Sequence, residues 1–393
     1  MRIKFLEKNG QKKFLKEDII LKGRRKVCRT NMTYLISNPT YKRRMSKKIF
    51  IGNVGIGGDS PVVIQSMTTT DTRDVESTIK QIKELASAGC EIVRVAVPDN
   101  VAAGKLGEIR KQSPIPLISD IHFDWRLALE AIRQGVDGLR LNPGNIGDKS
   151  RVKEVVKAAK EKNIPIRIGV NSGSLDSKWL SKYGLDRIHE AMVASALEHV
   201  QILEDLDFNL IKISLKASDV PVMIEAYRLI RDKTEYPLHV GVTEAGTQKG
   251  GTIKSSIGIG TLLSEGIGDT IRVSLTGDPV HEIEVARGIL RSLGLRQEGL
   301  NLVSCPSCGR MELNNFEEMA KVVEEKLKDL KKPITVAVMG CVVNGPGESK
   351  AADIGIAGGN GKGVIYKKGK VFKVLPEEKL LDALLEEITQ MTS

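Results

Sequence analysis

The residues best suited to chemistry are three cysteines near the C-terminus. Cys305 and Cys308 stand three positions apart in the segment Cys-Pro-Ser-Cys-Gly, and Cys341 follows 33 residues after the second. Two cysteines at this spacing can direct both thiolates at one metal centre, because the neighbouring Pro and Gly favour a tight turn. Cys341 is framed by glycines in the run Gly-Cys-Val-Val-Asn-Gly-Pro-Gly-Glu, which permits close backbone approach. The spacing predicts a site with three thiolate ligands.

The composition of this site favours iron and sulfur over zinc. A structural zinc site usually has four Cys or His ligands, but the second pair is missing here and no histidine follows His281. A four-iron cluster bound by three cysteines leaves one iron to another ligand, and Glu348, beyond the Gly-Pro-Gly turn, is the nearest candidate carboxylate. Packed, redox-inert cysteines remain an alternative, whereas a disulfide is disfavoured because nothing suggests export.

A second set of candidate residues is basic and stands in apolar surroundings. Four arginines each lie between hydrophobic neighbours: Arg94, Arg140, Arg167 and Arg272. Lys212, Ser214 and Lys216 alternate with apolar residues in the same way. Since side chains alternate along a strand, these cations would point away from the helix-covered face and converge. Such a set needs a polyanion to neutralise it, and several arginines together indicate a diphosphate, although an internal salt bridge to Asp120 or Glu244 is the alternative for any single one.

The elements that would position these residues form a repeating pattern. Eight short β-branched runs follow one another, at residues 62–65, 92–95, 117–120, 138–141, 166–169, 210–214, 239–242 and 271–274. Amphipathic helical stretches follow them, for example at 75–88 and 280–293. Eight such units over roughly 240 residues predict a closed (β/α)8 TIM barrel. A doubly wound open sheet is the alternative, but it would carry a Gly-x-Gly-x-x-Gly run after its first strand, and none is present.

Polar residues cluster where these strands should end. They are Asp120, His122, Asn142, Asn145, Asn171, Ser172, Glu244, Ser274 and Thr276. Because TIM barrels build their active sites at the carboxyl ends of the strands, we expect these side chains to complete the anion site.

The chain beyond the barrel is expected to form a smaller α+β unit. The Gly-bounded segment between Leu293 and Ser304 is a plausible linker. After it, the patterns predict helices at 316–330 and 377–391, strands at 334–339 and 353–357, and a hairpin at 364–374. The expected domains are therefore a basic extension at 1–45, a barrel at 46–293 and a cysteine-bearing domain at 294–393.

Charge is distributed unevenly along the 393 residues, whose formal net charge is +11. Residues 1–48 hold 16 Lys and Arg against three acidic residues, whereas the other 345 hold 44 against 46. For this basic arm, a solvated extension is the favoured interpretation and nucleic-acid binding the less favoured one.

No apolar run is long enough to cross a bilayer and no signal-peptide core is present, so we expect a cytoplasmic protein. Cys28 and Cys90 are expected to be structural or incidental.

Six motifs resemble those of the (E)-4-hydroxy-3-methylbut-2-enyl diphosphate synthase family of the methylerythritol phosphate route to isoprenoids. They are Val-Ile-Gln-Ser-Met-Thr at 63–68, Asp-Ile-His-Phe at 120–123, Leu-Arg-Leu-Asn-Pro-Gly-Asn at 139–145, Gly-Val-Asn-Ser-Gly-Ser at 169–174, Gly-Val-Thr-Glu-Ala-Gly at 241–246 and Cys-Val-Val-Asn-Gly-Pro-Gly-Glu at 341–348. The resemblance covers about residues 46–391. The basic arm departs from the short N-terminus usual in the family, and the absence of a large inserted domain points to the short bacterial type.

The resemblance implies a fold, a cofactor and a reaction. It implies a TIM barrel joined to a [4Fe-4S] domain like the repeat unit of sulfite reductases, with Cys305, Cys308, Cys341 and Glu348 as ligands. The family is an iron–sulfur oxidoreductase that acts on a CH or CH2 group. It opens and dehydrates 2-C-methyl-D-erythritol 2,4-cyclodiphosphate with two electrons from reduced flavodoxin or ferredoxin, and it works as a head-to-tail homodimer with a shared active site.

The resemblance also implies residue roles by position. The diphosphate would be held by Arg94, Arg140, Arg167, Lys216, Arg272 and Ser274. The reacting carbons would be lined by Asp120, His122, Asn171 and Glu244, with Glu244 as candidate acid. The rival from another class is an iron–sulfur or zinc sensor that binds RNA through its basic arm. A radical enzyme using S-adenosylmethionine is disfavoured because no Cys-x-x-x-Cys-x-x-Cys run is present.

Overall fold

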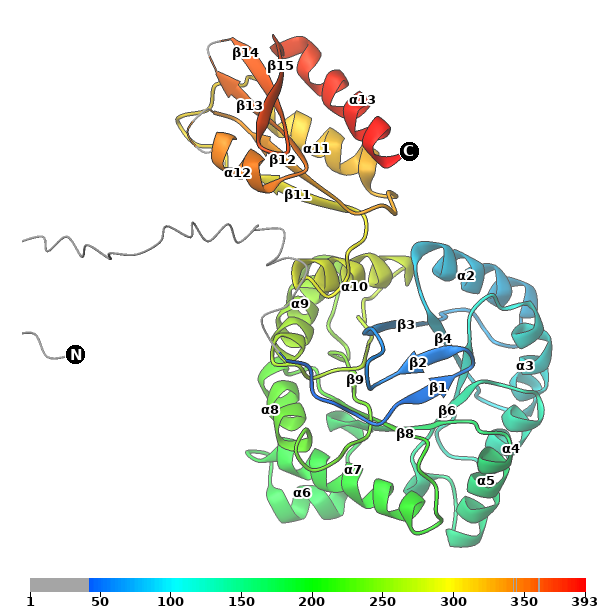
Figure 1. Ribbon diagram of the computed structural model, residues 1–393. Coiled ribbons are helices and arrows are strands. Elements are labelled where there is room, and N and C mark those ends of the chain that lie inside the picture. The colour runs from blue at the N-terminus through cyan, green and yellow to red at the C-terminus, as the bar shows by residue number, and fades with distance from the viewer. Residues whose placement is uncertain (1–41, 342, 344, 360) are drawn as a thin grey trace, which may run out of the picture.

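The computed structural model describes residues 42–393 except 342, 344 and 360 (Figure 1). The basic arm up to residue 41, including Cys28, therefore lies outside the described residues. The described chain forms a barrel ringed by helices and, beyond α10 (Val280–Ser292), a smaller unit built on its own sheet (Figure 1). None of the helices in the described part of the chain is long and apolar enough to cross a membrane.

The barrel has the predicted architecture. In the described part of the chain, eight parallel strands pair in the order β8-β7-β6-β5-β4-β3-β10-β9, and a parallel bridge between Ile213 and Leu238 joins β8 to β9. The strands are β3 (Val63–Met67), β4 (Ile92–Ala96), β5 (Leu117–Asp120), β6 (Gly138–Arg140), β7 (Ile166–Asn171), β8 (Ile211–Lys216), β9 (His239–Val240) and β10 (Thr270–Ile271). The TIM barrel expected from the eight repeats is thereby confirmed, and the open doubly wound sheet is excluded.

Helices cover the outside of this barrel, as Figure 1 shows. They are α2 (Val75–Ala88), α3 (Asn100–Gln112), α4 (Trp125–Arg133), α5 (Lys149–Glu161), α6 (Ser177–Tyr183), α7 (Ile188–Glu204), α8 (Val220–Ile230), α9 (Gln248–Ser264) and α10 (Val280–Ser292). Six of them begin at an aspartate whose side chain accepts a backbone N–H of the first turn: Asp74, Asp99, Asp124, Asp148, Asp176 and Asp219. These caps satisfy amides that would otherwise lack partners, and so fix where each helix starts.

A short hairpin that the sequence did not predict closes the floor of the barrel. Strands β1 (Ile49–Ile51) and β2 (Val54–Ile56) pair antiparallel and lie across the barrel opening in Figure 1. Their isoleucines form an apolar cluster with Val63, Ile92 and Ile118, which stand at or near the amino ends of their strands. The amino end of the barrel is therefore apolar and sealed, and any polar site must lie toward the other end.

The smaller unit is a five-stranded sheet in the order β11-β12-β13-β14-β15. Its strands are β11 (Leu300–Ser304), β12 (Ile334–Met339), β13 (Ile354–Gly359), β14 (Lys362–Lys367) and β15 (Lys370–Pro376), and its helices are α11 (Phe316–Leu327), α12 (Gly345–Ala351) and α13 (Leu380–Thr392). The predicted helices, strands and hairpin are present. Strand β11 was not predicted, because its residues were read as part of the linker and the cysteine segment.

The two units have separate hydrophobic cores. The barrel core runs along the chain as far as Leu290, with Leu293 and Leu295 packed against it, and the second core begins at Leu300. The predicted boundary between residues 293 and 294 falls in this interval. The domain division stays a prediction, as does the likeness of the smaller unit to sulfite reductases.

Removing side-chain volume from the barrel floor should destabilise the protein. Ile56 is fully buried in the floor cluster, whereas Phe50 of the same hairpin is 55% exposed. We expect Ile56→Ala to lower the free energy of unfolding by about 2–5 kcal/mol, since it leaves a cavity. Phe50→Ala is the matched control and should change it by less than about 1 kcal/mol. Urea denaturation of both variants checks this, and equal effects would show that the hairpin does not seal the core.

Candidate active site

A cavity of about 200 Å³ opens at the carboxyl ends of the barrel strands. Its lining residues are Arg94, Asp120, His122, Arg140, Arg167, Asn171, Lys216, Thr243 and Arg272. Five of these are basic residues and one is a carboxylate, and the four arginines alone give the cavity an excess of positive charge. Burial, with Arg272 and Arg167 close by, lowers the pKa of Lys216 well below its usual value. The four arginines converge as the alternation of strand residues predicted. Pockets for drug-sized ligands are about 300–1,000 Å³, so this cavity suits a smaller and strongly anionic molecule.

Asp120 is the carboxylate at the centre of this set. Its oxygens lie 3.6 Å from Arg94 Nε, 3.3 Å from Arg140 Nη1 and 3.5 Å from His122 Nε2. Burial alone would raise the pKa of the Asp120 carboxyl, but Arg94, the hydrogen bond with His122 and Arg140 together hold it well below its usual value. Asp120 is therefore ionised and fixes two of the arginines, so the internal salt bridge considered as an alternative is present for those two.

Several donor atoms of the arginines have no hydrogen-bond partner among the described residues. Four buried guanidinium nitrogens lack a hydrogen-bond acceptor: Arg94 Nε, Arg140 Nε, Arg167 Nε and Arg167 Nη2. Burial lowers the pKa of Arg94 to about 10 despite Asp120. Burial, with Arg94 and Arg140 close by, lowers the pKa of Arg167 well below its usual value. Donors left unpaired in this way favour a ligand that brings several oxygen acceptors.

Arg140 packs so closely against Gly169 that a larger residue at position 169 would clash with it. Its Nη2 donates to the carbonyl oxygen of Gly169 at 3.0 Å, and a Cβ on Gly169 would lie 2.6 Å from Arg140 Nε. The side chain of Asn142 holds the same glycine by two hydrogen bonds of 2.9 Å, one to its N–H and one to its C=O. Asn142 therefore acts on the barrel backbone, which it ties down beside the arginine.

Glu282 is a functional residue that the sequence reasoning missed. This buried carboxylate on α10 accepts hydrogen bonds from Arg272 Nη2 at 3.2 Å and from the Ser66 hydroxyl at 2.8 Å. It thereby orients Arg272 from a helix on the outer side of the barrel. One sequence signal pointed to it: Glu282 stands on the same face of the helix as Ala286 and Ile289, where an apolar residue is the usual choice.

Six of the nine polar residues expected to complete the anion site lie outside this cavity's lining: Asn142, Asn145, Ser172, Glu244, Ser274 and Thr276. Ser274 is partly buried near the end of β10, and Glu244 is exposed on the loop after β9. Glu244 has a φ of 52°, in the left-handed region that non-glycine residues rarely occupy. Such backbone conformations occur often at functional sites. The structure thus brings together Asp120, His122 and Asn171 but places Glu244 at the rim.

A second cavity, of about 280 Å³, adjoins the first and shares Asn171 with it. Asn145 and the mostly buried His199 also line it. His199 Nδ1 accepts the Gly144 N–H at 3.2 Å, and burial lowers the pKa of this imidazole. His199 is therefore neutral and holds the loop that follows β6.

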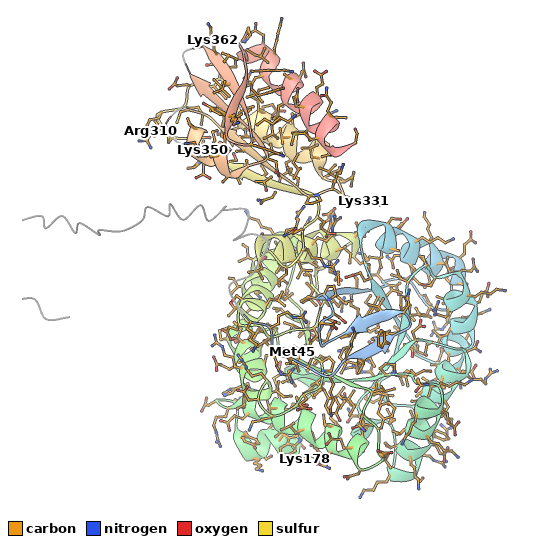
Figure 2. All side chains as sticks on the ribbon, in the orientation of Figure 1. Met45, Lys178, Arg310, Lys331, Lys350 and Lys362 are labelled. Carbon is orange, nitrogen blue, oxygen red and sulfur yellow. The ribbon has the colours of Figure 1, made fainter. Side chains whose placement is uncertain are left out.

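The cysteines stand at one edge of the smaller sheet. Cys305 directly follows β11 and Cys341 follows β12, and because these neighbouring strands run parallel, both residues lie at their carboxyl ends. The N–H of Gly340 donates to Cys305 Sγ at 3.4 Å. Cys308 is exposed, and the backbone N–H of Arg310 lowers the pKa of its thiol. Figure 2 shows Arg310 at the outer edge of this unit. Hydrogen bonds to sulfur and a stabilised thiolate are features of metal-binding cysteines.

The described residues do not yet form a site for a single metal ion. Among them, no group of three or more His, Cys, Asp or Glu side chains stands close enough to hold one. Glu348 is exposed in the first turn of α12. In contrast, Cys90 is buried, its Sγ donates to the Ile92 carbonyl oxygen, and burial raises the pKa of its thiol to about 12, which is consistent with the structural role expected of it.

The fold and the cavity define a class. A closed parallel barrel with converging cations at its carboxyl end, followed by a cysteine-bearing α+β unit, is a two-part TIM-barrel protein that binds a small polyanion. The chain belongs to the GcpE family: the profile of the GcpE TIM-barrel domain matches residues 46–287, and that of the GcpE protein C-terminal domain matches residues 301–390. The match begins at residue 46, so the basic arm precedes it.

Relatives with curated names agree with this family. The chain is 60% identical over 347 residues to a 4-hydroxy-3-methylbut-2-en-1-yl diphosphate synthase (flavodoxin) of Thermodesulfovibrio yellowstonii, covering 88% of this chain and 99% of that relative. A protein of the same name from Clostridium acetobutylicum is 60% identical over 351 residues, covering 89% of this chain and all of that relative. The predicted family resemblance is confirmed.

Removing the carboxylate of Glu282 should destabilise the barrel. Glu282→Gln leaves Arg272 in a largely buried position without an ionised partner, so we expect the free energy of unfolding to fall by about 3 kcal/mol. The control is Glu284→Gln on the same helix, because the side chain of Glu284 is 62% exposed. Chemical denaturation at pH 7 measures both, and equal losses would contradict the positioning of Arg272 by Glu282.

Proposed function

We propose that this protein converts 2-C-methyl-D-erythritol 2,4-cyclodiphosphate into (E)-4-hydroxy-3-methylbut-2-enyl diphosphate by reductive ring opening and dehydration. The observation that carries this function is the cavity with five basic residues and one carboxylate in a barrel of the GcpE family. The name shared by relatives of about 60% identity, 4-hydroxy-3-methylbut-2-en-1-yl diphosphate synthase, supports the reaction and its place in isoprenoid biosynthesis. The protein is accordingly an oxidoreductase.

The cation-lined cavity is the site for the diphosphate. Arg94, Arg140, Arg167, Lys216 and Arg272 supply the charge, and Ser274 at the end of β10 adds a hydroxyl donor. The arginines that carry the unpaired nitrogens line the cavity, so the ligand enters a positive field that is already in place. Asp120 and Glu282 hold three of the arginines in place by the ion pairs described above. The diphosphate oxygen that leaves the ring would be stabilised by this fixed positive field.

The cofactor proposed for the smaller unit is a [4Fe-4S] cluster held by Cys305, Cys308, Cys341 and Glu348. The residues present fit such a group, because the Gly340 N–H already donates to Cys305 Sγ and the backbone beside Arg310 favours the thiolate of Cys308. A cluster takes one ligand per iron and spreads its ligands further apart than a single ion does. When bound, it would pass on, one at a time, the two electrons that the external donor supplies.

The chain's own acid and polar groups would act on the carbon skeleton. Asp120, His122 and Asn171 line the cavity and would orient the hydroxyl groups of the substrate. Glu244, at the rim on a loop that bears Thr243 of the lining, would donate the proton with which the second oxygen departs as water. Its exposed position allows it to exchange protons with solvent between turnovers.

Partners follow from the chemistry. Flavodoxin, which the relatives' names print, is the proposed electron donor, and ferredoxin is the alternative expected from the sequence. The cavity and the cysteines stand in separate units. We therefore propose a head-to-tail homodimer, in which the cysteine loops of one copy close the barrel of the other.

RNA binding would depend on the arm, which lies before the family match and almost wholly outside the described residues. The cytoplasmic location stays a prediction.

Loss of one thiol should remove the cluster. Anaerobically purified protein should show a broad visible absorption band that dithionite bleaches. We expect Cys308→Ser to lose most of this band, since a hydroxyl is a much poorer ligand for iron. Cys90→Ala is the control, because Cys90 is buried in the barrel, and it should keep the band. A band that survives in Cys308→Ser would remove this residue from the ligand set.

Loss of the proposed acid should slow turnover without preventing binding. We expect Glu244→Gln to lower kcat by about 10²–10⁴-fold, the usual contribution of general acid catalysis, while the visible band stays unchanged. Glu235→Gln is the matched control at a carboxylate whose side chain is 78% exposed, and its kcat should equal that of the wild type. Steady-state kinetics with dithionite and a mediator test both variants. Unaltered kcat in Glu244→Gln would exclude it as the acid.

A further inference from the structure

Beneath the anion cavity the barrel contains a polar layer that no step of the proposed reaction uses. Gln65, Lys212, His239 and Thr270 belong to it, and each of them is at most 1% exposed. They alternate with residues of the barrel core, for instance Ile64, Ile213 and Ile271, so they point into the barrel. Below them lies the apolar floor made by the β1–β2 hairpin. A polar layer between an apolar floor and a ring of cations is an unusual barrel interior.

Lys212 is the basic residue of this layer with the fewest partners. Among the described residues its one hydrogen bond is to Gln65 Oε1, at 3.4 Å, and no carboxylate lies within salt-bridge distance. Within the described ranges, the Nε2 of the Gln65 amide also has no hydrogen-bond partner. An ammonium group buried with a single long hydrogen bond and no counter-charge is strongly disfavoured. The amine form, which has no such penalty, is the form this environment favours.

Arg167 connects this layer to the cavity. The register of β7 and β8 pairs Arg167 with Lys212, while the Arg167 side chain donates to the Ser214 hydroxyl and lines the cavity above. Lys216, two inward positions beyond Lys212 on β8, lines the same cavity. The protonation state of Lys212 therefore depends on the charge held in the cavity.

The charged and titratable groups around Lys212 are mostly positive. Burial, then Arg167 and Arg94, lowers the pKa of Lys212 well below its usual value, and Asp269 opposes this. Asp269 is already held by Arg43 at 3.0 Å and by the Ser46 hydroxyl at 2.9 Å. His239 faces the layer with its Nδ1 2.7 Å from the Thr270 hydroxyl, and burial and Lys216 lower its pKa too. The Tyr227 hydroxyl donates to the His239 carbonyl oxygen, and burial raises the pKa of this tyrosine.

We propose that Lys212 is a positioning residue that takes up a proton when a diphosphate enters the cavity above it. Burial is the main obstacle to protonation of Lys212, and the positive field of Arg167 and Arg94 adds to it; the arriving anion cancels that added field. The proton comes from solvent, and the ammonium group then adds its charge beneath the anion. The inference rests on the proposed diphosphate site and extends it: anion affinity becomes dependent on pH through a residue that does not touch the ligand.

The sign of the pH dependence follows from the two pKa values of Lys212, the lower one in the free protein and the higher one in the complex. Below both values, or above both, the affinity does not depend on this residue. Between them the complex holds one more proton than the free protein, so affinity falls by up to about tenfold for each unit by which pH rises.

The test is proton uptake on binding inorganic pyrophosphate to the purified, cluster-loaded protein. Titration calorimetry at pH 7 in two buffers of different ionisation enthalpy gives the number of protons bound per pyrophosphate. The wild type should take up more protons than Lys212→Met, by up to one per site. The exposed Lys157 provides the matched control, since Lys157→Met changes the same residue type on the outer face of α5 and should behave as the wild type.

A second variant keeps the test decisive if Lys212→Met does not fold. Gln65→Glu would give Lys212 a carboxylate partner, so the lysine would already hold its proton in the free protein, and the extra uptake should disappear. Uptake equal to that of the wild type in either folded variant would overturn the proposal while leaving the diphosphate site intact. No binding of pyrophosphate by the wild type would overturn the diphosphate site itself, and this inference with it.

Discussion

An excess of positive charge inside a closed barrel is the constraint on which the rest of this structure depends. The cavity gathers five basic residues against one carboxylate, and four guanidinium nitrogens of these arginines have no hydrogen-bond acceptor among the described residues. Burying such charge is unfavourable unless an anion compensates it. The buried positive charge thus destabilises the free protein. Binding of a polyanion relieves this destabilisation, which adds to the free energy of binding.

Several features offset the destabilising effect of this buried charge. The floor formed by Ile49, Ile51 and Ile56 closes the amino end, so the polar residues open to one side. Asp120 links two arginines from within the barrel, and Glu282 holds a third from behind its wall. Together these contacts keep the donors apart and oriented, which is the preorganisation that electrostatic stabilisation of a departing diphosphate requires.

The chemistry is divided between two units with separate cores. In the proposed reaction the barrel binds and polarises the substrate, while the cysteine loops stand at the carboxyl ends of β11 and β12 in the smaller sheet. In both units the reactive groups follow the ends of parallel strands, where the loops are free to vary without disturbing the hydrogen-bonded ladder. This common placement explains how a barrel and a small α+β sheet can contribute to one reaction.

The sequence by itself determined the eight strands, the helices between them, the convergence of Arg94, Arg140, Arg167 and Arg272, and the family. Strand alternation is a local property, so it specifies which side chains face inward. Only the tertiary structure decided that Glu282 pairs with Arg272, that Glu244 stands at the rim and that the hairpin seals the floor. It also decided that Lys212 has no carboxylate within salt-bridge distance in the part of the chain that the structure describes. Those contacts join residues far apart in the chain or on different elements, and their geometry depends on how the elements pack, which no local pattern encodes.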